Sequence, residues 1–523
     1  MAAADLLWAG PQCDGWAVTR INKTKTCGAI VAALALCVLV LSAVHLDLPP
    51  GRGAAERTSV QAAAWLVFAV GAWLVRTLPI RAAVLLIIVG GIGLQVAAFS
   101  SPPLTSSDSY RYVWDGRVQA AGIDPYRYVP AAPELAPFRD PSFLWARTSR
   151  SWCVEPGSPD PDRAGAVLAP GCTLINRPGV HTIYPPVAEG YFAVVHALSP
   201  KSARTQPIQI AAAVMAVATT VLLILGLSRL GRDPRLAVLW AWCPLVALEA
   251  GNNAHIDVVE AFLLVGALLI LARATSRPRA LLGGVVLGLA VAAKFFPVLV
   301  APAISRRRPI AVASAAAGAI AAVYLPHVLA VGGGVIGYLP GYLKEEGYDS
   351  GSRFALLGLL VPPRYAALVA VAVLAGAALV VWRTADPDQP WRGALVMAGV
   401  FLLVTSPALP WYGELIIVLV ALDGRVEWLA VGAGGYLMWA MIDLGLPALE
   451  ATRIGYGTGA LVVLVVSLAR MIAAHGGTSV ARESVAVLAA QNARPVATSP
   501  YGRRSLRIPY VDRRLSDSGR QAG

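Results

Sequence analysis

The segment "SSDSYRYVWDG" directly follows a long apolar run and carries the residues best suited to acid–base chemistry. Its first carboxylate, Asp108, can act as a general base with a near-normal pKa if a hydroxyl group is held beside it. The structural alternative is that Asp108 caps a short surface helix closed by Gly122, while Asp115 pairs with Arg111 one turn earlier. The segment by itself leaves both interpretations open.

Three more ionisable residues lie in or between apolar runs. Lys294, in "AAKFFP", is costly inside a membrane segment and could bind an anionic phosphate, although a lysine near the interface can also extend its amine to water. His255 and Asp257, in "NNAHID", occupy an expected outer turn between two apolar segments. His255 would either bind phosphate or be solvated. Because no further ligands accompany this His-x-Asp pair, no metal site is expected.

Aromatic, proline-rich segments recur at the expected membrane boundaries, in "INRPGVHTIYPP" and "SPALPWYGE". Trp and Tyr are enriched at such boundaries in any membrane protein, but their faces can also pack against sugar rings. A further loop, "GYLKEEGYDSGSR", could be solvated or could bind an acceptor. The candidates for substrate binding are Arg111, Asp115, Tyr184, Asp257, Arg353, Trp411 and Tyr412.

The elements that must position these residues are transmembrane helices. Hydrophobic residues make up 57% of the 523 residues and charged residues only 14%, against about 25% in soluble globular domains. The net charge of +13 reflects arginines in short segments between apolar runs, which is typical of cytoplasmic loops and argues against a nucleic-acid partner. We expect an all-α polytopic membrane protein with a bundle of about 12 spans plus short or broken helices. The bundle would occupy 28–475, between a cytoplasmic segment at 1–27 and a basic, disordered, cytoplasmic tail at 476–523.

Charge also sets the expected orientation. The basic segment "RINKTK" precedes the first span, which places the N-terminus in the cytoplasm. Spans near 28–47, 60–77 and 82–100 then put the loop 101–185 on the extracytoplasmic side. This loop holds eight acidic residues and eight arginines, so it is nearly neutral, and we expect it to carry interfacial helices.

A broken helix is expected around Lys294. The segments "RPR" (277–279) and "RRR" (306–308) both resemble cytoplasmic loops, so an even number of crossings must separate them. The 26 residues between them are too few for two crossings of about 20 residues each. A pair of shortened helices with its tip near Lys294 resolves this, and such helices are tolerated only where they line a cavity.

The six cysteines show no metal-site spacing. Cys153 and Cys172 share the long polar loop. In an oxidising compartment a disulfide between them would stabilise the fold by roughly 3 kcal/mol. Two free thiols are the alternative.

Between about residues 80 and 460 the pattern resembles the GT-C superfamily of integral-membrane glycosyltransferases. The motifs that carry the resemblance are "SDSYRYVWDGRVQAAGIDPY" and "TIYPPVAEGYF", with looser matches in the His-x-Asp hairpin, the lysine in a broken helix and "PWY". The pattern is most similar to the actinobacterial polyprenyl-phosphomannose-dependent mannosyltransferases. The resemblance implies that Asp108 is the catalytic base and that Lys294, with His255, neutralises the donor phosphate.

What the resemblance implies about function is specific. Mannose would pass from polyprenyl-phosphate mannose to a lipid-linked glycan or lipoglycan, with inversion to an α-mannoside, at the outer face of a bacterial plasma membrane. The partners would be this donor, the acceptor and membrane lipids. No cofactor is expected, and recruitment of a divalent metal by the loop carboxylates is left open.

Three alternatives remain at this point. The first keeps the fold and changes the donor to polyprenyl-phosphate arabinose, because both donors present the same phosphate and lipid. The second is a transporter or flippase of lipid-linked sugars, which usually shows internal repeats and binding charges near the midplane. Polar residues here concentrate in one outer loop, which favours an enzyme at the interface. An inactive assembly partner would tolerate Asp108→Asn.

Overall fold

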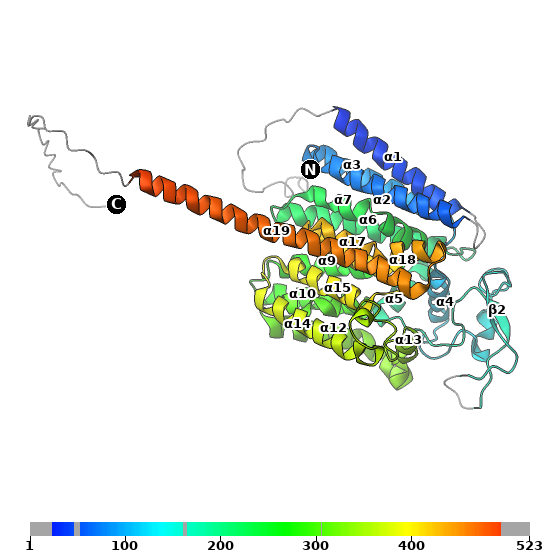
Figure 1. The fold of residues 1–523 in the computed structure, drawn as a ribbon. Coiled ribbons are helices and arrows are strands. Elements are labelled where there is room, and N and C mark those ends of the chain that lie inside the picture. The colour runs from blue at the N-terminus through cyan, green and yellow to red at the C-terminus, as the bar shows by residue number, and fades with distance from the viewer. Residues whose placement is uncertain (1–22, 47–52, 161–164, 305, 493–523) are drawn as a thin grey trace, which may run out of the picture. The chain divides into compact units, whose positions relative to one another are not determined.

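The computed structural model describes residues 23–46, 53–160, 165–304 and 306–492, and nearly all of these residues lie in helices or the turns between them (Figure 1). Within this part of the chain, seven helical segments are long and apolar enough to cross a membrane. The protein is therefore an all-α polytopic membrane protein, as expected. The seven are α1 (Lys23–His45), α2 (Ala54–Arg76), α3 (Ile80–Ala98), α6 (Gln206–Arg229), the segment Pro309–Glu345 with α12 (Pro309–Val331) and α13 (Leu339–Glu345), α14 (Pro363–Thr384) and α19 (Ala448–Asn492).

Full-length spans are fewer than the roughly 12 expected, because several apolar segments are broken into short helices. One pair, Pro244–Asn252 and α9 (Asp257–Leu271), bends by 117° and would make an eighth span. Hydropathy alone could not show these breaks. The other short helices are α4 (Asp108–Ala120), α5 (Pro186–Leu198), α7 (Val238–Ala241), α8 (Pro244–Val246), α10 (Arg277–Ala293), α11 (Ala301–Ile304), α15 (Pro390–Thr405), α16 (Gly413–Asp423), α17 (Leu429–Gly432) and α18 (Gly434–Asp443).

Residues Met1–Val465 form a first compact unit, and its core is built around buried helices. Helix α16 is buried along its whole length, and it packs against α9 and α15. Helix α6 packs against α3 and α9, while α10 packs against both α9 and α12. Helices α1, α2 and α3 lie side by side on one flank (Figure 1, blue). Because the outer helices face lipid, their many exposed apolar side chains need no protein partner.

Helix α4 differs from the expected surface helix. It begins at Asp108, the N-cap is Ser107, and the backbone N–H of Asp108 donates to the hydroxyl of Ser106, so the alternative in which Asp108 caps the helix is wrong. The helix is largely buried against α5, where the rings of Tyr112 and Phe192 stack at 4.2 Å. At the same contact, a Cβ atom on Gly116 would lie 2.6 Å from the carbonyl oxygen of Phe192. The helix is thus fixed by close packing along its length.

The expected break at Lys294 is present. Helix α10 ends at Ala293, and Lys294 has an extended backbone with φ −158° and ψ 143°. A 3₁₀ helix (Phe296–Val300) and α11 follow before α12 begins. Pro297 has no backbone N–H to donate to the carbonyl of Ala293, so the α-helical hydrogen bonds cannot continue through this segment.

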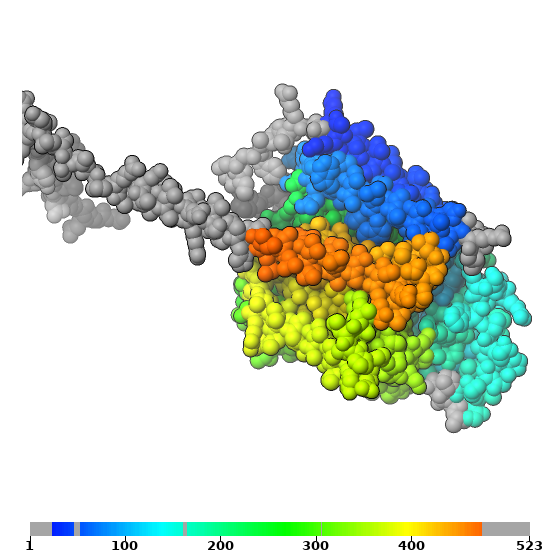
Figure 2. Space-filling model, in the orientation of Figure 1, coloured from blue at the N-terminus to red at the C-terminus, as the bar shows by residue number. Residues whose placement is uncertain are grey.

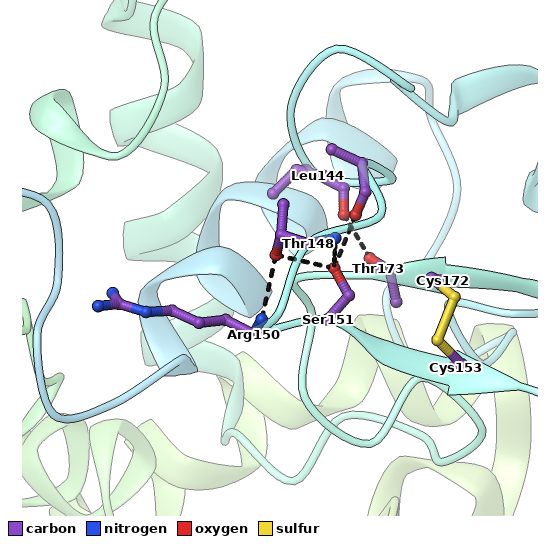
Figure 3. The surroundings of a disulfide bond; sticks show 8 residues. Leu144, Thr148, Arg150, Ser151, Cys153, Cys172 and Thr173 are labelled. Atoms are coloured by element: carbon purple, nitrogen blue, oxygen red, sulfur yellow. Dashed lines mark hydrogen bonds between the residues drawn. A yellow bond between two sulfur atoms is a disulfide. The ribbon is translucent and has the colours of Figure 1, made fainter. Parts of the chain in front are cut away.

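The polar loop contains one short hairpin, which a disulfide closes (Figure 3). Strands β1 (Trp152–Val154) and β2 (Gly171–Thr173) pair antiparallel, with Cys153 opposite Cys172, and these cysteines form a disulfide, which was one of the two alternatives left open by the sequence. The hairpin is anchored to the loop because the Thr173 hydroxyl donates to the carbonyl of Leu144 at 2.5 Å. The loop (cyan) lies at one end of this unit, next to the yellow-green segment that contains α13 (Figure 2).

The C-terminal boundary differs from the expected one. Helix α19 continues past Gly476 and Gly477 to Asn492, so the helical chain passes through the start of the expected tail. The chain splits into two compact units, Met1–Val465 and Val466–Gly523, and the boundary between them lies within this helix. Most of the expected N-terminal segment, at 1–22, and the tail at 493–523 lie outside the described residues.

Candidate active site

A cavity of about 610 Å³ lies in the first unit, and side chains from distant parts of the sequence line it. They come from the start of α4, the loop before α5, the break after α10, α13 with the turn that follows it, and the segment between α15 and α16. The polar and aromatic residues that line it include Asp108, Arg111, Trp152, Asn176, Arg177, Tyr184, Lys294, Tyr338, Tyr342, Glu346, Trp411 and Tyr412.

Asp108 presents its carboxylate to this cavity from the loop end of α4. Its side chain is 18% exposed, and Oδ1 accepts a hydrogen bond from the Asn176 amide at 2.6 Å. Burial raises the pKa of Asp108 above its ordinary value, and the hydrogen bond from Asn176 partly offsets that rise. A carboxylate with a raised pKa is a stronger base than a free aspartate.

The hydrogen bond from Asn176 to Asp108 predicts how the transfer rate depends on pH. A general base must be ionised, so activity falls as the pH drops through the raised pKa of Asp108. Asn176→Leu removes the hydrogen bond that lowers this pKa, so the acidic limb of the rate profile is expected to move to higher pH. The limb is measured as transfer rate against pH at saturating substrates. An unmoved limb in a folded variant would show that another group titrates.

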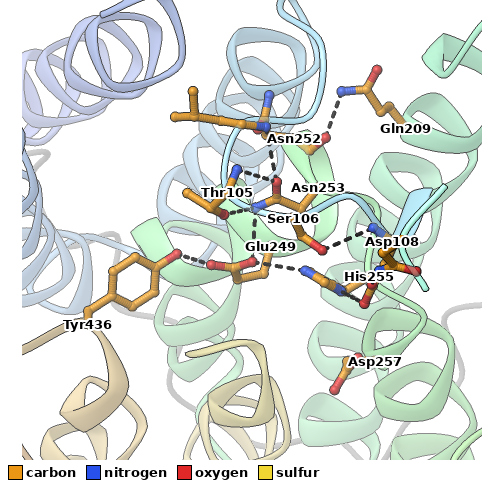
Figure 4. A network of polar contacts seen from close by, with 12 residues as sticks. Thr105, Ser106, Asp108, Gln209, Glu249, Asn252, Asn253, His255, Asp257 and Tyr436 are labelled. Carbon is orange, nitrogen blue, oxygen red and sulfur yellow. Dashed lines mark hydrogen bonds and ion pairs between the residues drawn. The ribbon is translucent and has the colours of Figure 1, made fainter. Parts of the chain in front are cut away.

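His255 lies behind Asp108 in a buried polar network (Figure 4). Its Nδ1 is 3.7 Å from Oδ2 of Asp108, and its Nε2 is 3.4 Å from a carboxylate oxygen of Glu249. The ring stacks on Trp411 at 3.9 Å and is 1% exposed. His255 is neither solvated nor among the cavity-lining residues, so it lies behind Asp108 and against the ring of Trp411 rather than at the expected phosphate position.

Two asparagines in the same network hold the chain that leads into Asp108 (Figure 4). The Asn252 side chain accepts from the backbone N–H of Leu104 at 2.9 Å and donates to the carbonyl of Ala98 at 3.0 Å. The Asn253 amide donates to the Thr105 hydroxyl at 2.7 Å. Because these bonds fix both ends of the turn after α3, they set where α4 starts.

Lys294 reaches the cavity from the break after α10. Its Nζ donates to Oδ2 of Asp257 at 2.6 Å and lies 4.8 Å from the centre of the Tyr412 ring. Asp257 is buried at the start of α9 and does not line the cavity. Its contact indicates that Asp257 orients the ammonium group rather than meeting a substrate.

Asp115, the other carboxylate of this segment that could act as a base, is held in an ion pair with Arg111. Both of its oxygens accept from Nε of Arg111 at 3.0 Å, and the pair is buried. Arg111 lines the cavity and also donates to the carbonyl of Val180 at 3.2 Å. Since Asp115 does not line the cavity, Asp108 is the carboxylate with access to a substrate.

The aromatic candidates all line the cavity. They are Tyr184, Trp411 and Tyr412, and the hydroxyl groups of Tyr412 and Tyr342 share a hydrogen bond of 2.6 Å. Arg353 does not line the cavity, because it is buried in an ion pair with Glu346. The predicted residues therefore divide into those that line the cavity and those buried outside its lining, which are Asp115, His255, Asp257 and Arg353.

The model of glycosyltransferase family 87 matches residues 182–407 of this chain. The matched region, which is less than half of the chain, is similar to this glycosyltransferase family. The matched region includes Tyr184, His255 and Lys294, whereas Asp108 and Trp411 lie outside it. No curated protein matches the chain.

Among solved structures, an oligosaccharyltransferase from Archaeoglobus fulgidus, tethered to an acceptor peptide, is similar at 12% identity with a TM-score of 0.34. The similarity covers 72% of this chain and 55% of that chain. The protein thus spans about half the length of the solved relative.

Several cavity residues were not predicted. Asn176 and Arg177 stand in a segment whose aromatic residues drew attention instead, and Arg177 pairs with Glu345 at 3.0 Å. Trp152 carries no local motif, and Tyr342 lies in the segment "GYLKEEGYDSGSR" but was not singled out. Within the described ranges, no group of three or more His, Cys, Asp or Glu side chains is arranged to hold a metal ion.

Proposed function

We propose that this protein is a glycosyltransferase that transfers mannose from polyprenyl-phosphate mannose to a lipid-linked glycan. The observation that carries the proposal is that Asp108 and Lys294, from distant parts of the sequence, face one cavity. A carboxylate and an ammonium group are the two charges that such a transfer needs, one for the acceptor hydroxyl and one for the departing phosphate.

The proposed reaction is a single displacement. Asp108 accepts the proton of an acceptor hydroxyl while that oxygen bonds to C1 of the mannose. The bond between C1 and the phosphate oxygen breaks, and the electron pair leaves with the polyprenyl phosphate. Lys294 stabilises the charge that grows on that phosphate. Attack from the face opposite the phosphate inverts C1, so a β-linked donor gives an α-mannoside.

The walls of the cavity support a lipid donor. Phe295, Phe296, Phe401 and Leu409 line it and offer an apolar path for a prenyl chain close to Lys294. The loop 101–185 supplies Asp108, and its disulfide favours an oxidising compartment. We therefore place the site on the outer face of a bacterial plasma membrane, with both termini in the cytoplasm and the catalytic domain at 28–475.

The experiment is a transfer assay with purified protein in lipid vesicles. Synthetic polyprenyl-phosphate mannose labelled in the sugar is expected to yield labelled α-mannoside on an alkyl mannoside acceptor. If the protein uses polyprenyl-phosphate arabinose and not the mannose donor, the proposed donor is wrong and arabinose is the sugar transferred. Movement of labelled donor across the vesicle membrane without any product would favour a flippase and overturn the proposal.

A further inference from the structure

One exposed tryptophan lines the cavity, and the packing of the fold does not explain its position there. Trp152 is 48% exposed, yet it lines the cavity that contains Asp108. Of the described residues between Val113 and Ile175, it alone does so. An exposed aromatic side chain at a polar cavity offers a flat apolar surface that the fold itself does not use.

The backbone of Trp152 is held firmly although its ring is exposed. Trp152 pairs with Thr173 across the hairpin, and the disulfide lies at the next pair of residues (Figure 3). The buried Thr173 hydroxyl and the backbone N–H of Leu174 both donate to the carbonyl of Leu144. The ring is thus presented from a rigid support, which reduces the entropy cost of binding against it.

The position of Trp152 in the loop indicates which substrate it meets. The apolar side chains suited to a prenyl chain come from the Lys294 break and from the region of α15 and α16. Trp152 instead comes from the polar loop outside the long apolar helices. A few residues after its strand partner, the same chain supplies Asn176 beside Asp108. The hairpin therefore borders the side from which an acceptor hydroxyl reaches the base.

We propose that Trp152 is a platform for the acceptor glycan, packing its ring against the C–H face of the sugar that receives mannose. This inference rests on the proposed function and extends it to a specificity-determining residue. The Cys153–Cys172 disulfide is the element that positions the platform. The competing role for an exposed tryptophan is to anchor the protein at the lipid surface.

The test compares Trp152→Ala with Trp382→Ala, because Trp382 on α14 is similarly exposed at 53% but does not line the cavity. With octyl α-mannoside as acceptor, Trp152→Ala is expected to raise the acceptor KM about tenfold, with the donor KM and kcat within about twofold of wild type. Trp152→Phe keeps an aromatic face and is expected to stay near wild type. Trp382→Ala is expected to change none of these values.

Removing the disulfide gives an independent test of the same inference. Cys153→Ser/Cys172→Ser keeps Trp152 but frees the hairpin, so its acceptor KM is expected to rise as well. An unchanged acceptor KM in Trp152→Ala overturns the inference. An equal rise in Trp382→Ala does so too, because it would indicate lipid anchoring.

Binding measured without transfer separates this inference from the proposed function. Octyl α-mannoside is titrated into purified wild type and Trp152→Ala by calorimetry, with thermal unfolding as the check on folding. Weaker binding by Trp152→Ala supports the platform even if no donor is turned over. Equal binding by both proteins overturns it even if mannose transfer is confirmed.

Discussion

Asp108→Asn is expected to reduce the transfer rate about a thousandfold, the middle of the range for loss of a general base. The amide has nearly the same shape, and its oxygen can still accept the hydrogen bond from Asn176. What it loses is the ability to accept a proton. The measurement is the initial rate of mannose transfer in vesicles at saturating donor and acceptor.

A matched control separates loss of the base from general damage. Asp349→Asn removes an exposed carboxylate that does not line the cavity, and it is expected to keep the wild-type rate. Both variants are compared at equal amounts of folded protein. A rate for Asp108→Asn close to wild type would mean that Asp108 is not the base.

Lys294→Met is expected to lower kcat/KM for the donor by about a hundredfold, because the phosphate loses its cation in the transition state. The same change leaves Asp257 buried without its partner. Removing one member of a buried ion pair typically costs about 3–5 kcal/mol, so this variant is also expected to unfold at lower temperature. Donor kinetics and thermal unfolding are therefore measured together.

The double variant Lys294→Met/Asp257→Asn separates the two effects. It removes both charges, so most of the lost stability is expected to return. Transfer is expected to remain low, because no cation faces the donor phosphate. Recovery of both stability and rate in the double variant would reduce Lys294 to a purely structural role.

The helical membrane fold and the break at Lys294 could be predicted from the sequence, because each follows from local physics. Apolar runs must form helices in lipid. The arginine clusters on both sides of Lys294 leave too few residues for two crossings. The pairing of Arg111 with Asp115 also depends only on helical spacing.

The contacts that complete the site could not be predicted, because they join residues that are far apart in the chain. Asn176 reaches Asp108 across 68 positions, and Lys294 reaches Asp257 across 37. The burial of α4 likewise depends on α5, so the segment alone favoured a surface helix. His255 was assigned to a turn correctly, but its buried position behind Asp108 arises from tertiary packing.

Gly116 is a position outside the cavity lining where a substitution is expected to disturb the site. Gly116 lies on the helix that starts with Asp108, about 12 Å from this residue at 1.5 Å per residue. A single methyl group on Gly116 would collide with the backbone of Phe192, tilt the helix and displace Asp108. Random mutagenesis would then yield inactive proteins that insert and fold normally, with lesions that no substrate ever touches.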